Sequence, residues 1–390
     1  MEIKPEVKSP TRLFFIDNLR ILLTILVIMH HTMITYGASG SWYFKDPNTD
    51  EFTSIILTIF AVLDQGFFMA LFFFISAYFV PGSYDRKGAR KFLKERFIRL
   101  GIPLILYVVI VNPLILYLLN IVPNQDISFF EYYLTYFQSV EAFFDYIGGN
   151  GPLWFVLMLL ILAVFYSIIY IIVPKNSEDV VEKKPPRNAL LIIICIIMGV
   201  LTFLVRLVFP ADGGDTIFNI QLCYIIQYII MFILGVEAYK RDWFRNISDS
   251  QGNFWFLIVL LSLVFFFVIG ALGGAFEGNN EPFTGGFRWQ AFAYAMWESF
   301  YCMGMCIGLI TLFRRKFNQQ GKVTKNLSCN AYTVYLIHAP VLIFISILFL
   351  YILIPALLKF IIVLPIVLLV CLFISHFILR KIPGAKRVLG

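Results

Sequence analysis

Ten long apolar stretches divide the chain at regular intervals. They cover roughly residues 13–36, 54–80, 98–121, 153–173, 189–209, 217–238, 254–274, 289–313, 328–353 and 358–379. Each has the roughly 20 mostly apolar residues that a membrane-spanning helix needs. The pattern predicts an all-α polytopic membrane protein, with about ten transmembrane helices around a polar interior cavity. Only a short turn near Pro355 separates the last two stretches, so the pattern alone also allows nine or eleven spans.

The whole sequence, residues 1–390, is interpreted as a single membrane domain with a bundle over about 13–379 and short tails. The first stretch is too long for a cleavable signal peptide and lacks a small-residue cleavage site. No internal repeat is visible. The longest loop is 122–152, in which the aromatic segment 128–147 is predicted to form an interfacial helix that a glycine-rich turn ends.

The distribution of charge supports this count of spans. Charged residues make up 14% of the chain and hydrophobic residues 60%, whereas a soluble domain carries about 25% charge, so a soluble protein is excluded. With the N-terminus in the cytoplasm, twenty-six of the 31 Lys and Arg residues fall on cytoplasmic segments, and three, Lys45, Arg288 and Lys359, fall on outer loops. This is the positive-inside pattern, and it predicts that both termini are cytoplasmic. The net charge of +7 therefore reflects topology and anionic lipid rather than nucleic acid.

One stripe of polar residues runs along the first span. Asp17, Arg20, Thr24, His31 and Thr35 lie within about 60° of one another at 100° per residue, and most of the rest of the span is apolar. Ionisable side chains in the membrane are costly, so such a stripe faces the bundle interior or a water-filled cavity. Arg20 and His31 are separated by about three turns, roughly 16 Å. The alternative interpretation is a buried polar seam that packs helices.

The other histidines and charged residues inside spans are weaker candidates. His30 points about 100° away from the stripe, which makes His31 the better candidate for chemistry. His338 follows Tyr335 by one turn, and a hydrogen-bonded core histidine is an equally good interpretation of it. Two lone carboxylates, Asp64 and Glu298, need a partner, for which Arg20, His31 and His338 are candidates. Arg206 and His376 lie near span ends, and we expect them to be interfacial.

A basic loop precedes the third span and contains Arg96 and Arg99. These arginines are three residues apart and face the same way if the segment is helical. Guanidinium groups suit phosphate because each offers a planar fork of donors. The alternative is simple anchoring at the positive-inside surface. No metal-ligand cluster, glycine-rich phosphate loop or serine nucleophile motif is visible, and we expect no metal.

Five motifs in order carry a resemblance to a known family. They are Asp17-x-x-Arg20 with His31, Phe72 to Ser76, Arg96-x-x-Arg99, Leu153-Trp154-Phe155, and Tyr335-Leu-x-His338. With these the chain resembles the acyltransferase-3 family of integral membrane acyltransferases over nearly its whole length. Ala77 stands where many members have glycine. The chain looks like a stand-alone form, similar to the glucan-biosynthesis succinyltransferases.

The resemblance implies transfer of an acyl group, acetyl or succinyl, from cytoplasmic acyl-CoA to a hydroxyl of a carbohydrate or glycolipid acceptor. In this interpretation Arg96 and Arg99 hold the donor phosphates, and the pantetheine arm passes Arg20, which Asp17 holds in place. The thioester then reaches His31, which acts as general base. Candidate residues for lining the site are Asp64, Ser76, Trp154, Glu298, Tyr335 and His338.

Two other function classes fit parts of the pattern. A secondary transporter or flippase would suit ten spans with charges at mid-depth, and it should show an internal repeat with broken helices in matching positions. A signalling or scaffold protein would not need the polar stripe of the first span. Turnover of acyl-CoA by the purified protein separates these classes.

Overall fold

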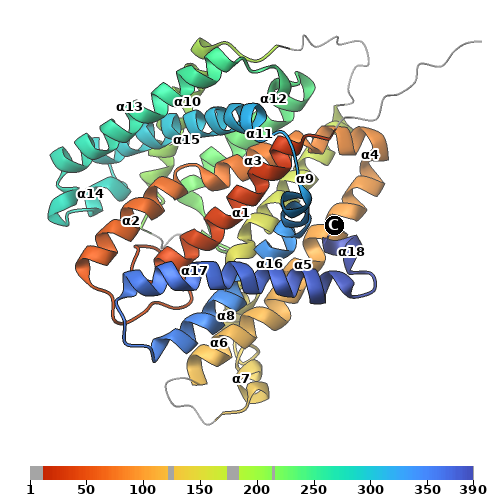
Figure 1. Cartoon of the computed structure of the whole chain (residues 1–390), viewed down its shortest axis with the longest axis vertical. Helices are drawn as coiled ribbons and strands as arrows, with labels where there is room; N and C mark the ends of the chain where they lie inside the picture. The colour runs from red at the N-terminus through yellow and green to blue at the C-terminus, as the bar shows by residue number, and fades with distance from the viewer. Residues whose placement is uncertain (1–11, 122–126, 174–183, 213–215, 390) are drawn as a thin grey trace, which may run out of the picture.

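The structure, a computed structural model, describes residues 12–121, 127–173, 184–212 and 216–389 and is helical almost throughout (Figure 1). Its first half contains α1 (Phe14–Thr35), α2 (Glu51–Gln65), α3 (Phe68–Tyr78), α4 (Val80–Arg96), η1 (Phe97–Gly101), α5 (Ile102–Leu106), η2 (Tyr107–Val111), α6 (Asn112–Ile121), α7 (Phe129–Thr135), α8 (Val140–Gly148), η3 (Gly151–Leu153), α9 (Trp154–Ile172) and α10 (Asn188–Arg206).

The second half begins with a small antiparallel hairpin that contains the only strands of the described residues, β1 (Thr216–Ile217) and β2 (Ile220–Gln221). The helices that follow are η4 (Leu222–Tyr224), α11 (Ile225–Lys240), α12 (Trp243–Asn246), α13 (Asp249–Gly273), η5 (Ala275–Glu277), α14 (Glu281–Thr284), α15 (Trp289–Lys316), α16 (Lys322–Leu350), α17 (Ala356–Phe373), η6 (Ile374–Ile378), η7 (Leu379–Lys381) and α18 (Ala385–Leu389).

Ten helical segments of the described chain are long and apolar enough to cross a membrane. They run from Phe14–Thr35 to Ala356–Lys381, and each coincides with one of the ten apolar stretches of the sequence. The predicted all-α polytopic fold is therefore confirmed. Four of the Lys and Arg residues that entered the charge count lie outside the described residues: Lys4, Lys8, Lys175 and Lys183.

The second span is two helices rather than one. α2 ends at Gln65 and α3 begins at Phe68, so the backbone is interrupted at Gly66 and Phe67. Inside a membrane an interrupted helix needs other partners for its backbone groups. Here the Nε2 of Gln227, on α11, donates a hydrogen bond of 3.0 Å to the Gly66 carbonyl. The apolar pattern did not reveal this break because only Asp64, Gln65 and Gly66 separate two long apolar runs.

The segment before the third span is a helix, which corrects the prediction of a loop. α4 begins at Val80 and continues without a gap through η1, α5 and η2 into α6. Gly88 bends it, with φ of 71° and no neighbouring atom where a side chain would start. The aromatic segment 128–147 likewise differs from the prediction, because it forms two helices. Ser128 and Ser139 cap α7 and α8 in turn.

Two of the motif segments pack together in the core. Phe73 of α3 contacts Phe155 of α9 and Tyr228 of α11, with ring centroids 4.7 and 4.9 Å apart. α3 and α11 approach closely because α11 carries Gly235, where a Cβ would lie 2.3 Å from the Phe74 carbonyl oxygen. Ala77 is fully buried at this contact. Because Gly235 has no side chain, there is room for the methyl group of Ala77 at the position where the resembled family often has glycine.

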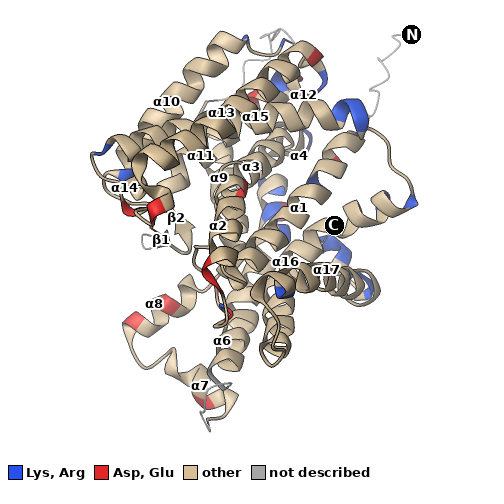
Figure 2. Ribbon diagram, turned by 60° about the vertical axis from the view of Figure 1, so that its left-hand side comes forward, with Lys and Arg blue, Asp and Glu red and all other residues tan. Residues whose placement is uncertain are grey.

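Charged residues separate toward opposite ends of the bundle (Figure 2). Lys and Arg gather near the N-terminus, α4, α12 and the C-terminus, and we call this the basic end. Asp and Glu gather at the loop before α2 and at α7, α8 and α14, which we call the acidic end. The arrangement matches the charge asymmetry on which the predicted topology rests.

Candidate active site

Two histidines from distant parts of the chain meet toward the acidic end of the bundle. The Nδ1 of His31, on α1, lies 2.9 Å from the Nε2 of His338, on α16. Their rings are nearly parallel, with centroids 5.0 Å apart. His338 is fully buried, whereas His31 is half-buried. The residue expected to act as base is therefore in direct contact with one of the candidate lining residues.

The contacts of His338 determine where the proton of each neutral ring lies. The Nδ1 of His338 contacts the Tyr335 carbonyl oxygen, which can only accept, so this nitrogen donates. The Nε2 of neutral His338 then carries a lone pair and accepts from His31 Nδ1. Neutral His31 is left with its lone pair on Nε2. That nitrogen makes no hydrogen bond to the described residues and is free to take a proton.

An aromatic loop covers this pair on the acidic side. Trp42, in the loop between α1 and α2, stacks on His31 with ring centroids 4.0 Å apart and 12° between planes. The next residue, Tyr43, donates a hydrogen bond of 2.6 Å to Asn112 Oδ1. Burial raises the pKa of Tyr43 to about 12, so its hydroxyl stays a donor. A side chain at Gly151 would collide with the Tyr43 hydroxyl, and its φ of +48° also favours glycine.

A buried ion pair holds the same loop in place. Lys359, in the first turn of α17, donates to Asp46 with Nζ 2.6 Å from Oδ2, and both side chains are buried. The backbone N–H of Asp46 donates to the carbonyl of Thr35, at the end of α1. The sequence interpretation placed Lys359 in an outer loop. The structure instead shows it as the anchor of the loop that carries Trp42.

Three arginines gather closer to the basic end. Arg20 of α1, Arg96 of α4 and Arg99 of η1 lie near enough for their charges to repel one another. Arg20 forms an ion pair of 3.6 Å with Asp17, which is also 2.7 Å from Arg12. Arg96 and Arg99 form no ion pair with the described residues.

Each of these arginines rests on an aromatic ring, with its guanidinium carbon 4.7 to 5.4 Å from the centroid. The Arg20 side chain nevertheless keeps 37% of its surface exposed. A cluster of guanidinium groups that are accessible and short of carboxylates is suited to an anionic ligand.

Asp64 has a different partner from those predicted. Its Oδ2 lies 3.2 Å from Nδ1 of His30, without the geometry of a hydrogen bond. His30 also stacks on Phe68, with ring centroids 5.1 Å apart. Neither Arg20 nor His31 nor His338 reaches this carboxylate. The two adjacent histidines of α1 therefore diverge as their helical positions predict.

Glu298 is also paired outside the histidine site. Its Oε2 accepts a hydrogen bond of 2.7 Å from Arg206, and both side chains are fully buried. The Arg206 guanidinium lies between the rings of Tyr224 and Tyr294, 5.1 and 5.3 Å from their centroids. The expectation that Arg206 is interfacial was wrong. A carboxylate on α15 and two tyrosine rings compensate its burial.

The other candidate lining residues, Tyr335, Trp154 and Ser76, lie on three different helices, α16, α9 and α3. Tyr335 is on the same turn as His338, and its hydroxyl donates to the Pro152 carbonyl. Trp154 stacks on Tyr228 and contacts Phe73. Ser76 is half-buried on α3, and its side chain forms no hydrogen bond with the described residues.

Sequence reasoning missed Trp42 and Tyr43. They lie in a loop, where helical periodicity gives no information about direction. Their position seven to eight residues after the last residue of α1 was the only available signal, and an aromatic pair at that point is common near a membrane surface.

Comparison with known proteins identifies a family and distant relatives. A family model described as an acyltransferase domain matches residues 13–376. Glucans biosynthesis protein C of Escherichia coli (strain K12) is 23% identical over 350 residues, which cover 85% of this chain and 83% of that protein. The protein of the same name from Shigella dysenteriae serotype 1 (strain Sd197) is 24% identical over the same length and coverage. No solved structure matches the chain.

Proposed function

Because the chain belongs to the acyltransferase-3 family of membrane acyltransferases, we propose that it transfers an acyl group, acetyl or succinyl, from acyl-CoA to a hydroxyl of a carbohydrate or glycolipid. The single observation that carries this proposal is the pairing of His31 with His338. The pairing leaves a histidine nitrogen with an available lone pair, as a general base for a hydroxyl requires.

The donor is held from the basic end. The phosphates of acyl-CoA bind to Arg96 and Arg99, and Arg20 lies next to them on the path toward the histidines. Arg20 is about 16 Å from His31 along α1. An extended pantetheine arm covers such a distance, so the thioester reaches His31 while the nucleotide stays at the arginines.

The transfer step needs one base and no covalent enzyme intermediate. Nε2 of His31 takes the proton of the acceptor hydroxyl as the hydroxyl oxygen attacks the thioester carbonyl carbon. The carbon–sulfur bond then breaks, and the proton on Nε2 passes to the departing CoA sulfur. His338 stabilises the imidazolium of His31 by accepting from its Nδ1. The products are an O-acyl ester and free CoA.

The relatives named as glucans biosynthesis proteins favour a carbohydrate acceptor. The aromatic loop residue Trp42 and the tyrosines around Tyr43 suit such an acceptor, because sugar C–H groups stack on aromatic faces. In the predicted topology this side of the histidines faces the outside of the cell, so the chain is a multi-pass cell-membrane enzyme with both termini in the cytoplasm.

A transporter or flippase is the alternative that one observation favours. The interruption of the second span at Gly66 and Phe67 resembles the broken helices of transporters. No other span of the described residues has a comparable gap at mid-depth, and the matching break that a repeat would require is missing.

The test uses the purified protein in detergent with acetyl-CoA or succinyl-CoA and a glucan acceptor. We expect free CoA thiol to appear together with acylated glucan, and both to appear about 10²–10⁴-fold more slowly in the His31→Ala variant. Movement of an acceptor across liposomes that contain the protein, with no loss of thioester, would replace the proposal by the transporter.

A further inference from the structure

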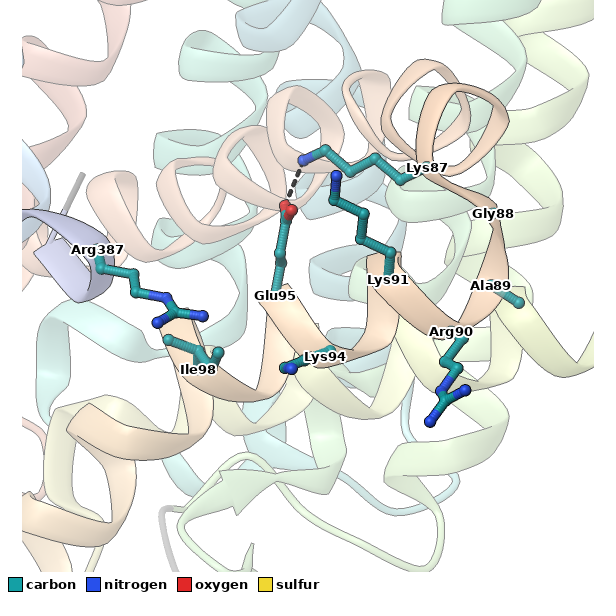
Figure 3. Close-up of a pocket in the computed structure, with 9 residues that line it drawn as sticks. All are labelled: Lys87, Gly88, Ala89, Arg90, Lys91, Lys94, Glu95, Ile98 and Arg387. Atoms are coloured by element: carbon teal, nitrogen blue, oxygen red, sulfur yellow. Dashed lines mark hydrogen bonds and ion pairs between the residues drawn. The ribbon is translucent and has the colours of Figure 1, made fainter.

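A groove rich in cations lies on the flank of α4, close to the basic end. It encloses about 650 Å³ between α4, η1 and α18. Figure 3 shows Arg387 reaching from α18 toward Ile98, with the ion pair between Lys87 and Glu95 on the other side. The residues that line the groove are Lys87, Gly88, Ala89, Arg90, Lys91, Lys94, Glu95, Ile98 and Arg387.

The groove contains more positive charge than its own carboxylate can neutralise. Lys87 and Glu95 form an ion pair with each other. The remaining four cations, Arg90, Lys91, Lys94 and Arg387, form no ion pair with the described residues. Four unpaired cations around one concave surface repel one another unless an anion binds between them.

This groove is separate from the arginine cluster of the proposed active site. Phe92 and Arg96 lie on one face of α4, and Phe92 is fully buried there. Lys94 is two residues from each, which places it about 200° around the helix from both. α4 therefore directs Arg96 toward the bundle interior and directs Lys94 toward its outer flank.

The groove continues into an exposed apolar track. Ile98, at the edge of the groove, is followed on the same helical run by Ile102 and Ile105, which are 40% and 62% exposed. Phe97 is 51% exposed beside them. These residues belong to a segment that is long and apolar enough to cross a membrane. Cations at its end and exposed isoleucines below them match the two parts of a phospholipid.

We propose that this groove is a binding site for an anionic phospholipid. The phosphate group of the lipid binds to Arg90, Lys91, Lys94 and Arg387, and its acyl chains lie along Ile98, Ile102 and Ile105. A nucleotide phosphate has the same charge, but it has no acyl chains to pack along the apolar track, so the geometry favours the lipid. Leu389 packs α18 against the hydrophobic core, and the bound lipid joins that helix to α4.

The experiment measures how much phosphatidylglycerol the full-length protein retains. The groove variant is Arg90→Gln/Lys91→Gln/Lys94→Gln. A matched control, Lys316→Gln/Lys322→Gln/Lys325→Gln, also removes three exposed cations near the basic end. Each protein is purified in detergent and titrated with phosphatidylglycerol or phosphatidylcholine. Native mass spectrometry counts the bound lipids, and size-exclusion chromatography verifies folding. Arg387→Gln serves as the variant to compare if the triple variant does not fold.

We expect the groove variant to bind phosphatidylglycerol roughly fivefold more weakly for each cation removed, and the control to bind as the original protein does. Phosphatidylcholine should bind equally to all three. Acyl-CoA is the second probe, and its affinity should not change in the groove variant. Unchanged phosphatidylglycerol binding in both the triple and the Arg387→Gln variants would overturn the proposal. So would a loss of acyl-CoA binding with lipid binding intact, because the groove would then be a nucleotide site.

Discussion

Two adjacent histidines of α1 have different neighbours, and this difference allows a direct test of the proposed base. His31 contacts His338, whereas His30 faces Asp64. Replacing His31 by alanine should lower the transfer rate by about 10²–10⁴-fold, because that is what general-base catalysis contributes. Binding of acyl-CoA should persist. The measurement is the rate of CoA release by purified protein, alongside donor affinity.

His30→Gln is the matched control, because an amide can still face Asp64. It should keep most of the activity. If it abolishes transfer while His31→Ala remains active, the base has to be reassigned to the other histidine.

In the proposed mechanism His338 acts through His31 and is a positioning residue. Its Nε2 accepts from His31 Nδ1 and so keeps the lone pair on the outward nitrogen. His338→Phe removes the acceptor and should reduce kcat by about tenfold or more, leaving the Michaelis constant for acyl-CoA unchanged. His338→Gln offers a carbonyl oxygen in place of Nε2 and should restore much of kcat. Equal rates for the two variants would show that the hydrogen bond has no influence.

For single residues, the sequence predicts the direction in which a side chain points better than it predicts which residue that side chain contacts. The angle between His30 and His31 follows from helical geometry, and the structure confirms it. The partners of Asp64 and Glu298 could not be predicted from the sequence, because a partner depends on how separate helices pack. Glu298 pairs with Arg206, 92 residues away, and no periodicity within either helix indicates that contact.

Among the elements, the helical run formed by α4 and η1 carries two sets of cations on opposite faces. Replacing Arg96 and Arg99 by alanine should remove the two proposed charge-assisted contacts to the donor phosphates, each of roughly 1.5–3 kcal/mol. The Michaelis constant for acyl-CoA should rise well over tenfold, with a smaller effect on kcat. Steady-state kinetics at varied donor concentration gives both constants. The control is Arg90→Ala/Lys94→Ala, which removes the same charge from the other face and should leave the constant alone. An equal increase of the Michaelis constant in both variants would show that the effect comes from the loss of net positive charge.

The loop between α1 and α2 depends on α17 for its position. Lys359→Met leaves Asp46 buried without a partner, which should destabilise the fold by about 3–5 kcal/mol. Thermal unfolding in detergent should show a lower midpoint, with reduced activity because Trp42 lies on the same loop. Asp46→Asn/Lys359→Met removes both charges and should recover most of the stability. A double variant no more stable than the single one would mean that the pair itself, rather than an unpaired carboxylate, matters.

Hydropathy located the elements well, but not their internal interruptions. α4 was taken as a loop because its many Lys and Arg residues hide the helical pattern. The break between α2 and α3 was missed for the opposite reason, since the apolar residues on either side outweigh the short polar segment Asp64-Gln65-Gly66. In both places the outcome depends on neighbours, such as Gln227 at the Gly66 carbonyl.

For the whole molecule, the segregation of charge predicts the orientation in the membrane. Lys and Arg gather at one end and Asp and Glu at the other, so we expect both termini on the cytoplasmic side. A reporter that is active only outside the cell, fused after Gly390, should be silent. The same reporter inserted between α7 and α8 should be active. Activity at Gly390 would mean an odd number of spans.

The number of spans and the fold class could be read from the sequence because the membrane allows so few arrangements of backbone. The site could be read only in part. His31, Arg20 and Asp17 share one helix, so their relation is local. Trp42 and Lys359 belong to the same site region through contacts between the first and the last spans, and such contacts have no signature in a single sequence.

Those long-range contacts have a consequence for how the protein is made. His31 and His338 are 307 residues apart, and Asp46 and Lys359 are 313 apart. At a synthesis rate of about 5–20 residues per second, the first span waits roughly 15–60 s in the membrane before its partners exist. During that time Asp46 must stay hydrated. The contacts of His31 with His338 and of Asp46 with Lys359 therefore form only after the last two spans are inserted, so the proposed site is assembled at the end of synthesis.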